Sequence, residues 1–341
     1  MFKYNAHMKN CQRVIVFGSK RIPYISVPLR SIEIEPYEIY SWGSPFRRFK
    51  AAATLFKVCK KFPDAPVIVD TPHWMGLAVL IITTLINRDY FLLLRGDVFK
   101  EFKSAFAIWM NKKILKNAKG IIFVSRYLKD KILHEIPTLD KFTVVPCPYL
   151  LKPVESNVSK EHKNILTVTG FYFYDKVKPL LMIIDVVDEF LDRFQDLTWD
   201  ICGGGPYLKE AMKKANSMKN SKRIKLHGHC NNVAFLYDNA FLFLYFTGLD
   251  TFPLVITEAY LHGLPVVANK AVSMTEVIED DKDGFLVDMN LHDWKDKLLD
   301  RLTFLFENPH AAFQMGLKGK EKVVNKYNPE RIGTLLREFL R

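Results

Sequence analysis

The sequence predicts an α/β protein with two tandem doubly wound domains, and three observations support this fold class. With 341 residues the chain is longer than one hydrophobic core usually grows, so two domains of ordinary size are expected. Short apolar runs rich in β-branched and aromatic residues alternate with longer segments of helical spacing. Those runs are apolar throughout, which is typical of parallel strands covered on both faces.

The first half of the chain contains candidates for a complete sheet and its helices. Strands are expected at 13–18, 37–42, 66–70, 90–94, 120–125 and 142–146, and helices at 46–62, 74–87, 101–118 and 126–135. The most hydrophobic window, 74–86, is followed by Asn87, Arg88 and Asp89. It is therefore shorter than the roughly 20 residues that a membrane span requires, and we expect a buried helix there.

The second half repeats the pattern after a linker at 146–164, where three prolines lie among Ser, Asn and Lys. Strands are expected at 164–170, 197–204, 223–228, 240–246, 264–269 and 284–288, and helices at 178–193, 206–218, 231–238, 253–262 and 273–279, with further helix from 293 to 341. This organisation predicts domains at 1–152 and 160–325. Residues 326–341 are expected to form a C-terminal helix that packs back on the first domain.

Composition and charge narrow the class of protein. A formal charge of +12 attracts phosphate groups on nucleotides, lipids or nucleic acids, but no nucleic-acid recognition module is visible, so nucleic acid is not an expected partner. The five cysteines are odd in number and include no CxxC pair, which predicts neither a zinc site nor a disulfide framework. The apolar run near the N-terminus is too short for a signal peptide. These features predict a cytoplasmic protein.

Residues suited to binding phosphate follow two strands of the second half. Gly170 is followed by a loop that brings Lys176 and Lys178 to the carboxyl edge of the sheet, where ligands of doubly wound sheets bind. Three glycines at 203–205 allow the backbone to approach a ligand closely. A tight strand-to-helix turn is the alternative interpretation of these glycines.

The stretch GLDTFPLVITEAYLHG, residues 248–263, predicts a helix that begins near Pro253 and ends at Gly263. Backbone N–H groups of Leu254 and Val255 are expected to be free at its start, where they bind an anion together with the helix dipole. Glu258 is spaced to reach a hydroxyl next to that anion. A solvated helix face is the alternative interpretation of this acid.

From about residue 164 to 290 the sequence resembles the retaining glycosyltransferases of family 4. In that family two acids flank a helix start of Phe-Pro-Leu type, followed by EAmaxGxPVV; here Asp250, FPLVIT, Glu258 and AYLHGLPVVAN stand in those places. TEVIEDDKDGFLVD also resembles a family segment. The resemblance implies the GT-B fold, with two Rossmann-like domains and the active site in the cleft between them.

The resemblance also implies a nucleotide-diphosphate sugar as donor, held mostly by the second domain. Glu258 would hold the ribose hydroxyls, Asp250 the donor sugar, and Lys176 the diphosphate. The base would lie near Gly228 and Cys230. The implied donor-site residues are Gly170, Lys176, Gly204, Gly228, Cys230, Phe252, Pro253, Leu254, Val255 and Glu258.

This sequence departs from the family pattern at three places. Phe171 stands where the family usually has an arginine, so one cation that would stabilise the leaving group is missing. Lys176 is expected to carry more of that stabilisation, and Lys178 is a second lysine that could replace the missing charge. Asp250 replaces a longer glutamate, which bears on the choice of donor sugar. GSKRIPY at 18–24 replaces the glycine pair that often follows the first strand, which bears on the acceptor side.

In the first domain the resemblance implies a catalytic residue after the third strand and acceptor contacts after the fourth. Asp70 occupies the family position, whereas His73 offers the usual side chain; His73 is slightly favoured, with a purely structural loop histidine as the alternative. Arg95 and Asp97 are the acceptor candidates. No metal and no cofactor are expected, since the nucleotide-sugar is a co-substrate.

The predicted function is transfer of a sugar, with retention of configuration, from a UDP- or GDP-sugar to a glycan or lipid-linked acceptor. The alternatives are a nucleotide-sugar epimerase on the same fold and a non-catalytic partner protein. The amphipathic, lysine-rich segment 44–62 suggests peripheral contact with an anionic membrane at its cytoplasmic face. An ordinary crossover helix explains that segment equally well.

Overall fold

The computed structural model describes residues 14–18, 34–38 and most of the chain from 53 onward, except for 54–55, 58, 62, 64–65, 71–73, 102–103, 150, 152, 155–163, 231 and 341. Only the backbone is described at 14–18, 34–38, 70, 74–79 and 100–101. The chain divides into two compact units. One is Met1–Leu150 together with Tyr327–Arg341, and the other is Leu151–Lys326.

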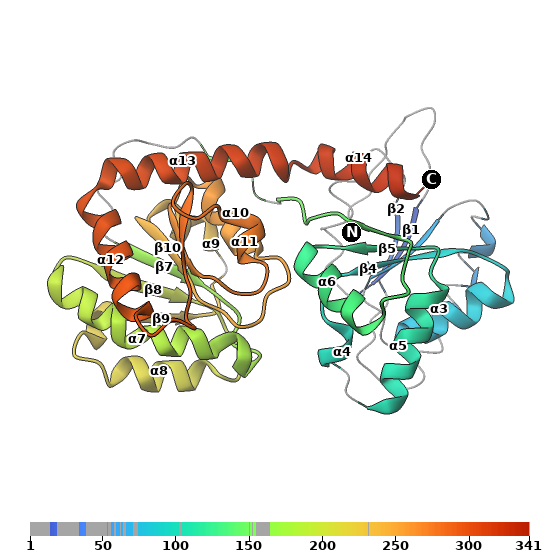
Figure 1. Ribbon diagram of the computed structural model, residues 1–341, viewed down its shortest axis with the longest axis horizontal. Coiled ribbons are helices and arrows are strands. Elements are labelled where there is room, and N and C mark those ends of the chain that lie inside the picture. Colours follow the sequence, from blue (N-terminus) through green and yellow to red (C-terminus); the bar gives the residue numbers. More distant parts are fainter. Residues whose placement is uncertain are drawn as a thin grey trace. The chain divides into compact units, whose positions relative to one another are not determined.

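The described strands of the first unit form a six-stranded parallel sheet in the order β2-β1-β3-β4-β5-β6 (Figure 1). Their bounds are β1 Val14–Gly18, β2 Ile34–Glu38, β3 Val67–Asp70, β4 Tyr90–Leu94, β5 Gly120–Phe123 and β6 Phe142–Val144. Every residue of β4 and β5 is buried, which is the reason for their continuous apolar sequences.

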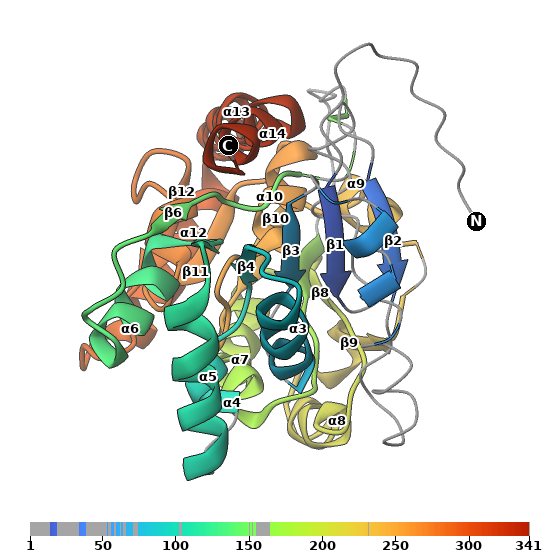
Figure 2. The same ribbon diagram turned by 90° about the vertical axis from the view of Figure 1, so that its right-hand side faces the viewer.

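The helices of the first unit with described bounds are α3 Trp74–Leu85, α4 Val98–Glu101, α5 Ala105–Asn117, α6 Arg126–Glu135 and α14 Pro329–Leu340. Figure 2 shows α3 and α5 running alongside each other beside the strands. Serine side chains begin two of these helices: Ser104 Oγ accepts the N–H of Ala107 at 3.2 Å, and Ser125 Oγ that of Leu128 at 3.1 Å.

The C-terminal helix α14 packs within the first unit. The Phe339 ring meets Phe91 edge-on with centroids 5.9 Å apart, and a Cβ at Gly120 would lie 2.7 Å from Phe339. The N–H of Tyr149 donates to Tyr327 O at 3.1 Å just before the helix begins. The last helix of the chain is therefore anchored to the sheet of the first unit.

The second unit contains a six-stranded parallel sheet in the order β12-β11-β10-β7-β8-β9. Its strands are β7 Asn164–Val168, β8 Thr198–Cys202, β9 Ile224–Gly228, β10 Leu242–Tyr245, β11 Val266–Asn269 and β12 Gly284–Val287. Its helices are α7 Tyr174–Arg193, α8 Leu208–Asn216, α9 Val233–Asp238, α10 Leu254–Leu261, α11 Met274–Val277, α12 Trp294–Glu307 and α13 Pro309–Lys326, with a 3-10 turn at Ser221–Arg223. Helices cover both faces of this sheet, with α7 and α8 on one and α10 and α13 on the other (Figure 1).

These two parallel α/β units confirm the predicted fold class, and several local predictions differ from the structure. The single helix expected at 101–118 is observed as the end of α4, at Glu101, and as α5, which begins at Ala105. The second strand lies at 34–38 instead of 37–42; it is an edge strand, where Pro36 is tolerated because its missing N–H needs no partner. Helix α7 begins at Tyr174, so Pro179 lies inside it. The helical stretch after 293 is divided into three helices, and α13 and α14 begin at Pro309 and Pro329, a position that suits proline.

No helix among the described residues is both long and apolar enough to span a bilayer. The segment 44–62 lies mostly outside the described residues.

Candidate functional site

The loops that follow β7, β8 and β9 are joined to one another at the carboxyl edge of the second sheet. Four backbone hydrogen bonds connect them: Thr169 N–H to Cys202 O at 2.9 Å, Phe171 N–H to Gly204 O at 3.0 Å, Tyr207 N–H to Phe171 O at 3.1 Å and Gly203 N–H to Gly228 O at 2.7 Å. Because these loops share hydrogen bonds, they form one framework at the predicted ligand edge.

The glycines of the loop after β8 have different tasks. Gly203 has φ +148°, and a Cβ there would lie 1.6 Å from Thr169 O. Gly205 has φ +145°, and a Cβ there would lie 2.4 Å from the backbone of Phe171. These two glycines are required by the tight contact between loops. A Cβ at Gly204 would instead make ordinary contact with His229, at 3.6 Å, so Gly204 is the member of the set next to the end of β9.

Phe171 occupies a core position. Its side chain is fully buried, and its backbone makes two of the four bonds between the loops. The side chain points into the hydrophobic core of the unit, so a cation here would be buried among apolar residues.

Lys176 and Asp250 are brought together by a proline inside α7. Pro179 has no N–H to bond the carbonyl of Asp175, and Gly248 N–H donates to that oxygen instead, at 3.1 Å. A Cβ at Gly248 would lie 2.4 Å from the same oxygen, so glycine permits the approach. The loop after β10 is thereby fixed to the first turn of α7, and Lys176 Nζ lies 3.4 Å from Asp250 Oδ2.

Both carboxylate oxygens of Asp250 have donors. The buried Tyr245 hydroxyl donates to Oδ2 at 2.7 Å, and the N–H of Phe252 donates to Oδ1 at 3.3 Å. Ser273 Oγ donates to the backbone oxygen of Asp250 at 3.2 Å. Burial, followed by the Asp250 charge, raises the pKa of Tyr245 well above its usual value, so the hydroxyl remains a donor.

Glu258 lies on α10 and is partly buried, so it does not stand on a fully solvated helix face. The Tyr237 hydroxyl donates to Glu258 Oε2 at 3.1 Å, and Val255 O lies 3.2 Å from the same hydroxyl oxygen. Burial raises the pKa of Glu258, and the Tyr237 bond opposes that rise. A partly buried acid with one donor retains capacity to accept bonds from a ligand.

The start of α10 differs from the prediction. Leu254 N–H donates to Phe252 O at 3.0 Å, so it is not the free donor that the sequence suggested. The cause is Pro253, whose φ of −81° and ψ of 84° are close to an inverse γ-turn, and this turn closes the bond across the proline. Pro253 provides no side-chain cap for the helix.

Two cysteines contradict the expectation of no disulfide. Cys202 and Cys230 are joined, with Cα atoms 6.1 Å apart. Cys202 ends β8 and is paired with Gly228 of the neighbouring strand β9, so Cys230 lies two residues beyond its register partner. Strand pairing brings the two residues together, which a search for adjacent cysteines in the sequence does not detect.

We expect the Cys202→Ser, Cys230→Ser double variant to lose about 2–4 kcal/mol of unfolding free energy, because the bond closes a loop of 28 residues in the unfolded chain. Denaturant unfolding measures this loss, and wild type with added reductant should match the double variant. Equal stability of oxidised wild type and the double variant would contradict a stabilising bond. Thiol counting on the denatured, unreduced chain checks that the bond is present.

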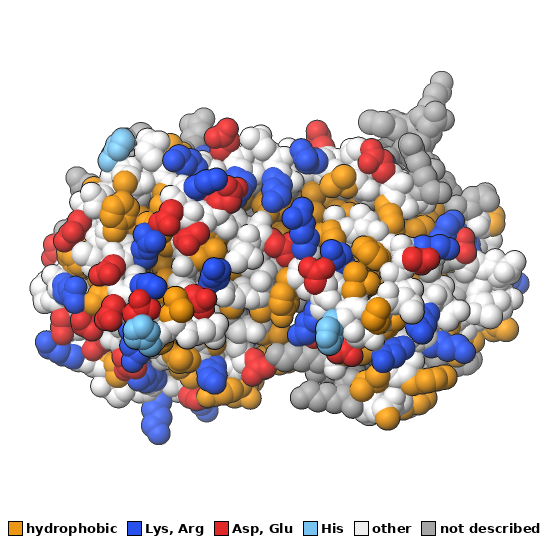
Figure 3. All heavy atoms as spheres, in the orientation of Figure 1, with side chains coloured by type: hydrophobic (Ala, Val, Ile, Leu, Met, Phe, Trp, Pro, Cys, Tyr) orange, Lys and Arg blue, Asp and Glu red, His pale blue; other side chains and the backbone are white. Residues whose placement is uncertain are grey.

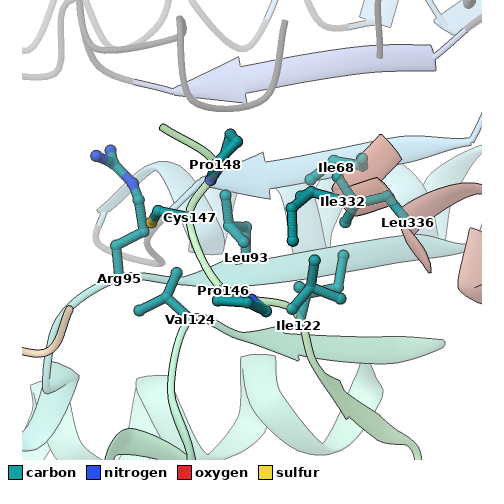
Figure 4. A pocket seen from close by; sticks show the side chains of 11 residues that line it. Ile68, Leu93, Arg95, Ile122, Val124, Pro146, Cys147, Pro148, Ile332 and Leu336 are labelled. Atoms are coloured by element: carbon teal, nitrogen blue, oxygen red, sulfur yellow. The ribbon is translucent and has the colours of Figure 1, made fainter. Parts of the chain in front are cut away.

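The acceptor candidates of the first unit have different surroundings. Among the described residues, Arg95 is the only charged one that lines an otherwise apolar pocket of about 370 Å3, including space open to solvent (Figure 4). Strands β3, β4 and β5, the segment 145–148 and α14 form that pocket. Asp97 is buried, pairs with Lys131 Nζ at 2.8 Å and accepts the N–H of Phe99 at 3.1 Å.

The end of β3 and the segment after it, which contain the two candidate catalytic residues, are described only in part. Asp70 is the last residue of that strand and is paired with Leu93 of β4, and only its backbone is described. His73 lies outside the described residues.

The acidic loop at 281–283 has structural partners. Asp283 Oδ1 accepts the Tyr260 hydroxyl at 2.8 Å and the Glu279 N–H at 3.0 Å, and Oδ2 pairs with Lys322. Among the described residues, no group of three or more His, Cys, Asp or Glu side chains is placed to hold a metal ion.

The structure thus places most of the predicted donor residues at one sheet edge. Lys176 and Asp250 are in contact, Gly170, Gly204, Gly228 and Cys230 belong to the bonded loops, and Glu258 lies on the helix that follows Asp250. Sequence reasoning missed the two tyrosines that hold the acids. In the sequence, Tyr245 is marked only as a polar hydroxyl near the end of the apolar run AFLFLYF, just before the loop that contains Asp250.

The chain is similar to known glycosyltransferases in sequence and in fold. A family model described as Glycosyl transferases group 1 matches residues 154–322. An uncharacterized glycosyltransferase of Haemophilus influenzae is 26% identical over 189 residues, 53% of this chain and 52% of that protein. Poly(ribitol-phosphate) alpha-N-acetylglucosaminyltransferase of Staphylococcus aureus is 23% identical over 340 residues, 96% of this chain and 66% of that protein. The chain spans about half to two thirds of the length of these curated relatives.

Solved structures share the fold. HepE of Anabaena, in complex with UDP and glucose, is similar with a TM-score of 0.78 and 15% identity, over 96% of this chain and 99% of that chain. A glycosyltransferase from Rickettsia africae is similar with a TM-score of 0.76 and 15% identity, over 97% and 98% of the two chains. The two parallel-sheet units have the GT-B fold of these neighbours.

Proposed function

Residues 154–322 of this chain belong to the glycosyl transferases group 1 family, and from this premise we propose that the protein transfers a sugar from a UDP- or GDP-sugar to a glycan or lipid-linked acceptor. The observation that carries the proposal is the contact of Lys176 with Asp250 at the carboxyl edge of a doubly wound sheet. A cation and an acid at that edge suit a ligand with both a diphosphate and sugar hydroxyls.

We assign each residue of the proposed site a task, and the contacts of each side chain support the assignment. Lys176, at the start of α7, stabilises the negative charge that develops on the diphosphate as the glycosidic bond breaks. Asp250, oriented by Tyr245, accepts hydrogen bonds from the donor sugar. Glu258, oriented by Tyr237, accepts hydrogen bonds from the ribose hydroxyls.

The finer parts of the proposal concern stereochemistry and acceptor. We propose retention of configuration, in which an oxygen of the donor phosphate takes the acceptor proton on the same face of the sugar and no protein nucleophile is used. Arg95, and either Asp70 or His73, are proposed to face the acceptor. Asp97 is proposed as a positioning residue, because its carboxylate holds Lys131 and the backbone at the start of α4.

Transfer and hydrolysis assays test the proposal. The protein is incubated with radiolabelled UDP-sugars and GDP-sugars, with and without a membrane lipid extract, and released nucleotide and transferred sugar are both measured. Acceptor-dependent transfer is the expected result. Sugar interconversion without transfer would indicate an epimerase, and no turnover with any donor would indicate a non-catalytic protein.

Tyr245→Phe is expected to reduce affinity for the nucleotide-sugar about tenfold and to leave affinity for the nucleotide alone unchanged. The variant removes a hydrogen bond to a charged group, worth about 1.5–3 kcal/mol, and leaves Asp250 less well oriented. Isothermal titration with the diphosphate and with its sugar measures both affinities.

Tyr237→Phe is the matched control, because this buried tyrosine holds Glu258 instead of Asp250. We expect it to weaken binding of the nucleotide and the nucleotide-sugar equally. If the two tyrosine variants behaved alike, the separate tasks of Asp250 and Glu258 would be wrong.

A further inference from the structure

Helix α5 in the first unit exposes two large aromatic side chains next to each other. Phe106 is 51% exposed and Trp109 is 56% exposed, and their rings stack with centroids 6.0 Å apart. Single exposed apolar residues are ordinary, but adjacent exposed aromatic rings form an apolar patch that suits a partner surface.

The aromatic pair belongs to a continuous stripe along the helix. Phe106, Trp109, Lys113 and Lys116 are spaced by three or four residues and lie on one face, which we name the α5 stripe. The opposite face is buried in the unit through Ala107, Met110, Asn111, Ile114 and Leu115. Lys113 Nζ lies 5.9 Å from the centre of the Trp109 ring, so cation and aromatic ring share the surface. The helix is therefore held by its inner face, and the stripe lies on its exposed side.

The surroundings of the stripe are basic. The sequence contains no acidic residue between Glu101 and Asp130, and Lys112 lies on α5 beside the stripe. Figure 3 shows hydrophobic and basic side chains gathered together over the lower end of α5. A surface of aromatic rings and lysines complements an anionic surface whose interior is apolar.

We propose that the α5 stripe is a peripheral docking surface for a bilayer that contains anionic phospholipid. Trp109 and Phe106 enter the headgroup region, where an aromatic ring is half in apolar and half in polar surroundings. Lys112, Lys113 and Lys116 contact lipid phosphates through long side chains that reach along the surface. A bilayer needs no shape-matched partner, which suits a short, convex helix surface.

This proposal differs from the sequence-based hypothesis for 44–62, because it assigns the contact to described residues of another helix. It is also independent of the proposed sugar transfer, since the α5 stripe contains none of the residues assigned to donor or acceptor. Nucleotide binding and lipid binding are therefore measured separately, and failure of one leaves the other standing.

Vesicle co-sedimentation of the full chain tests the proposal. Vesicles of phosphatidylcholine alone are compared with vesicles that also contain phosphatidylglycerol, at low and high salt. Wild type is expected to bind the anionic vesicles and to be released by salt. The Phe106→Ser, Trp109→Ser double variant is expected to bind at least about tenfold more weakly, since the buried apolar surface is lost. The Lys112→Gln, Lys113→Gln, Lys116→Gln triple variant should bind about 100-fold more weakly, since each lysine near an anionic surface contributes about a fivefold factor.

Matched controls come from the second unit. Phe235, which is 62% exposed on α9, is replaced by serine, and Lys209, Lys213 and Lys222 are replaced by glutamine to give the same change of charge. These variants should bind like wild type. A Trp109→Phe variant should still bind and should lose the blue shift of tryptophan emission that vesicles cause.

No binding of wild type to anionic vesicles would overturn the proposal. Equal losses in the α5 and control variants would also overturn it, because they would indicate non-specific attraction by the net charge. Circular dichroism and melting temperature show that each variant is folded before it is compared.

Discussion

Replacing Lys176 with alanine is expected to lower the rate of sugar transfer by about 100- to 1000-fold, which is the usual loss when one donor to a developing negative charge is removed. Lys176 is the cation fixed against Asp250 at the start of α7. Position 171 offers no second cation, because Phe171 is fully buried. Steady-state kinetics with saturating donor measures this loss as a fall in kcat.

Lys178→Ala is the matched control. Lys178 lies on the same helix, is exposed and forms no ion pair among those found in the described residues. We expect its variant to change the rate less than about threefold, the size of a screened surface charge effect. If Lys178→Ala were as slow as Lys176→Ala, general basicity of the helix start would explain the data better than the assigned role.

Replacing Glu258 with alanine is expected to weaken nucleotide binding by about 10- to 100-fold, because the ribose hydroxyls that donate hydrogen bonds to this carboxylate lose their acceptor. The Tyr237 hydroxyl would lose the same acceptor. Titration with the preferred diphosphate, with and without its sugar, measures the loss. Glu210→Ala, an exposed acid on α8, is the control and should bind like wild type.

Glu258→Gln separates binding from stability. Burial raises the pKa of Glu258, so its ionised form costs stability in the ligand-free protein as pH rises through that raised pKa. Glutamine keeps an acceptor for Tyr237 and removes the buried charge. We therefore expect a more stable variant near neutral pH that binds nucleotide less well, with the stability difference shrinking in acid. A variant that is less stable at neutral pH would indicate a purely structural role for Glu258.

The repeated pattern of apolar runs was enough to predict the sheets, because parallel strands buried on both faces leave a strong sequence pattern. Strand β4 was predicted at its observed bounds, and β9 within one residue. Edge strands are not required to be apolar throughout, and they were predicted unevenly: β9 lies within one residue of its expected bounds, whereas β2 begins three residues before them.

The site was predictable in part. Lys176 and Asp250 each lie in the segment that follows a strand, and Glu258 lies on the helix that follows Asp250, which places all three at one edge. Their partners were not predictable, since the contacts of Tyr245, Tyr237 and Gly248 depend on how separate elements pack. The helix expected from residue 178 begins earlier, at Tyr174, and Pro179 lies inside it. There Pro179 leaves the carbonyl of Asp175 available to the loop after β10.

We propose that the carboxyl edge of the second sheet binds a nucleoside diphosphate and its sugar. The most direct measurement is thermal unfolding of wild type and Glu258→Ala with UDP, GDP, ADP and their sugars, since a ligand that binds the native state raises its melting temperature. We predict a clear rise for one base, a larger rise for its sugar, and little change in the variant. No rise with any nucleotide, or an equal rise in both proteins, would contradict the claim.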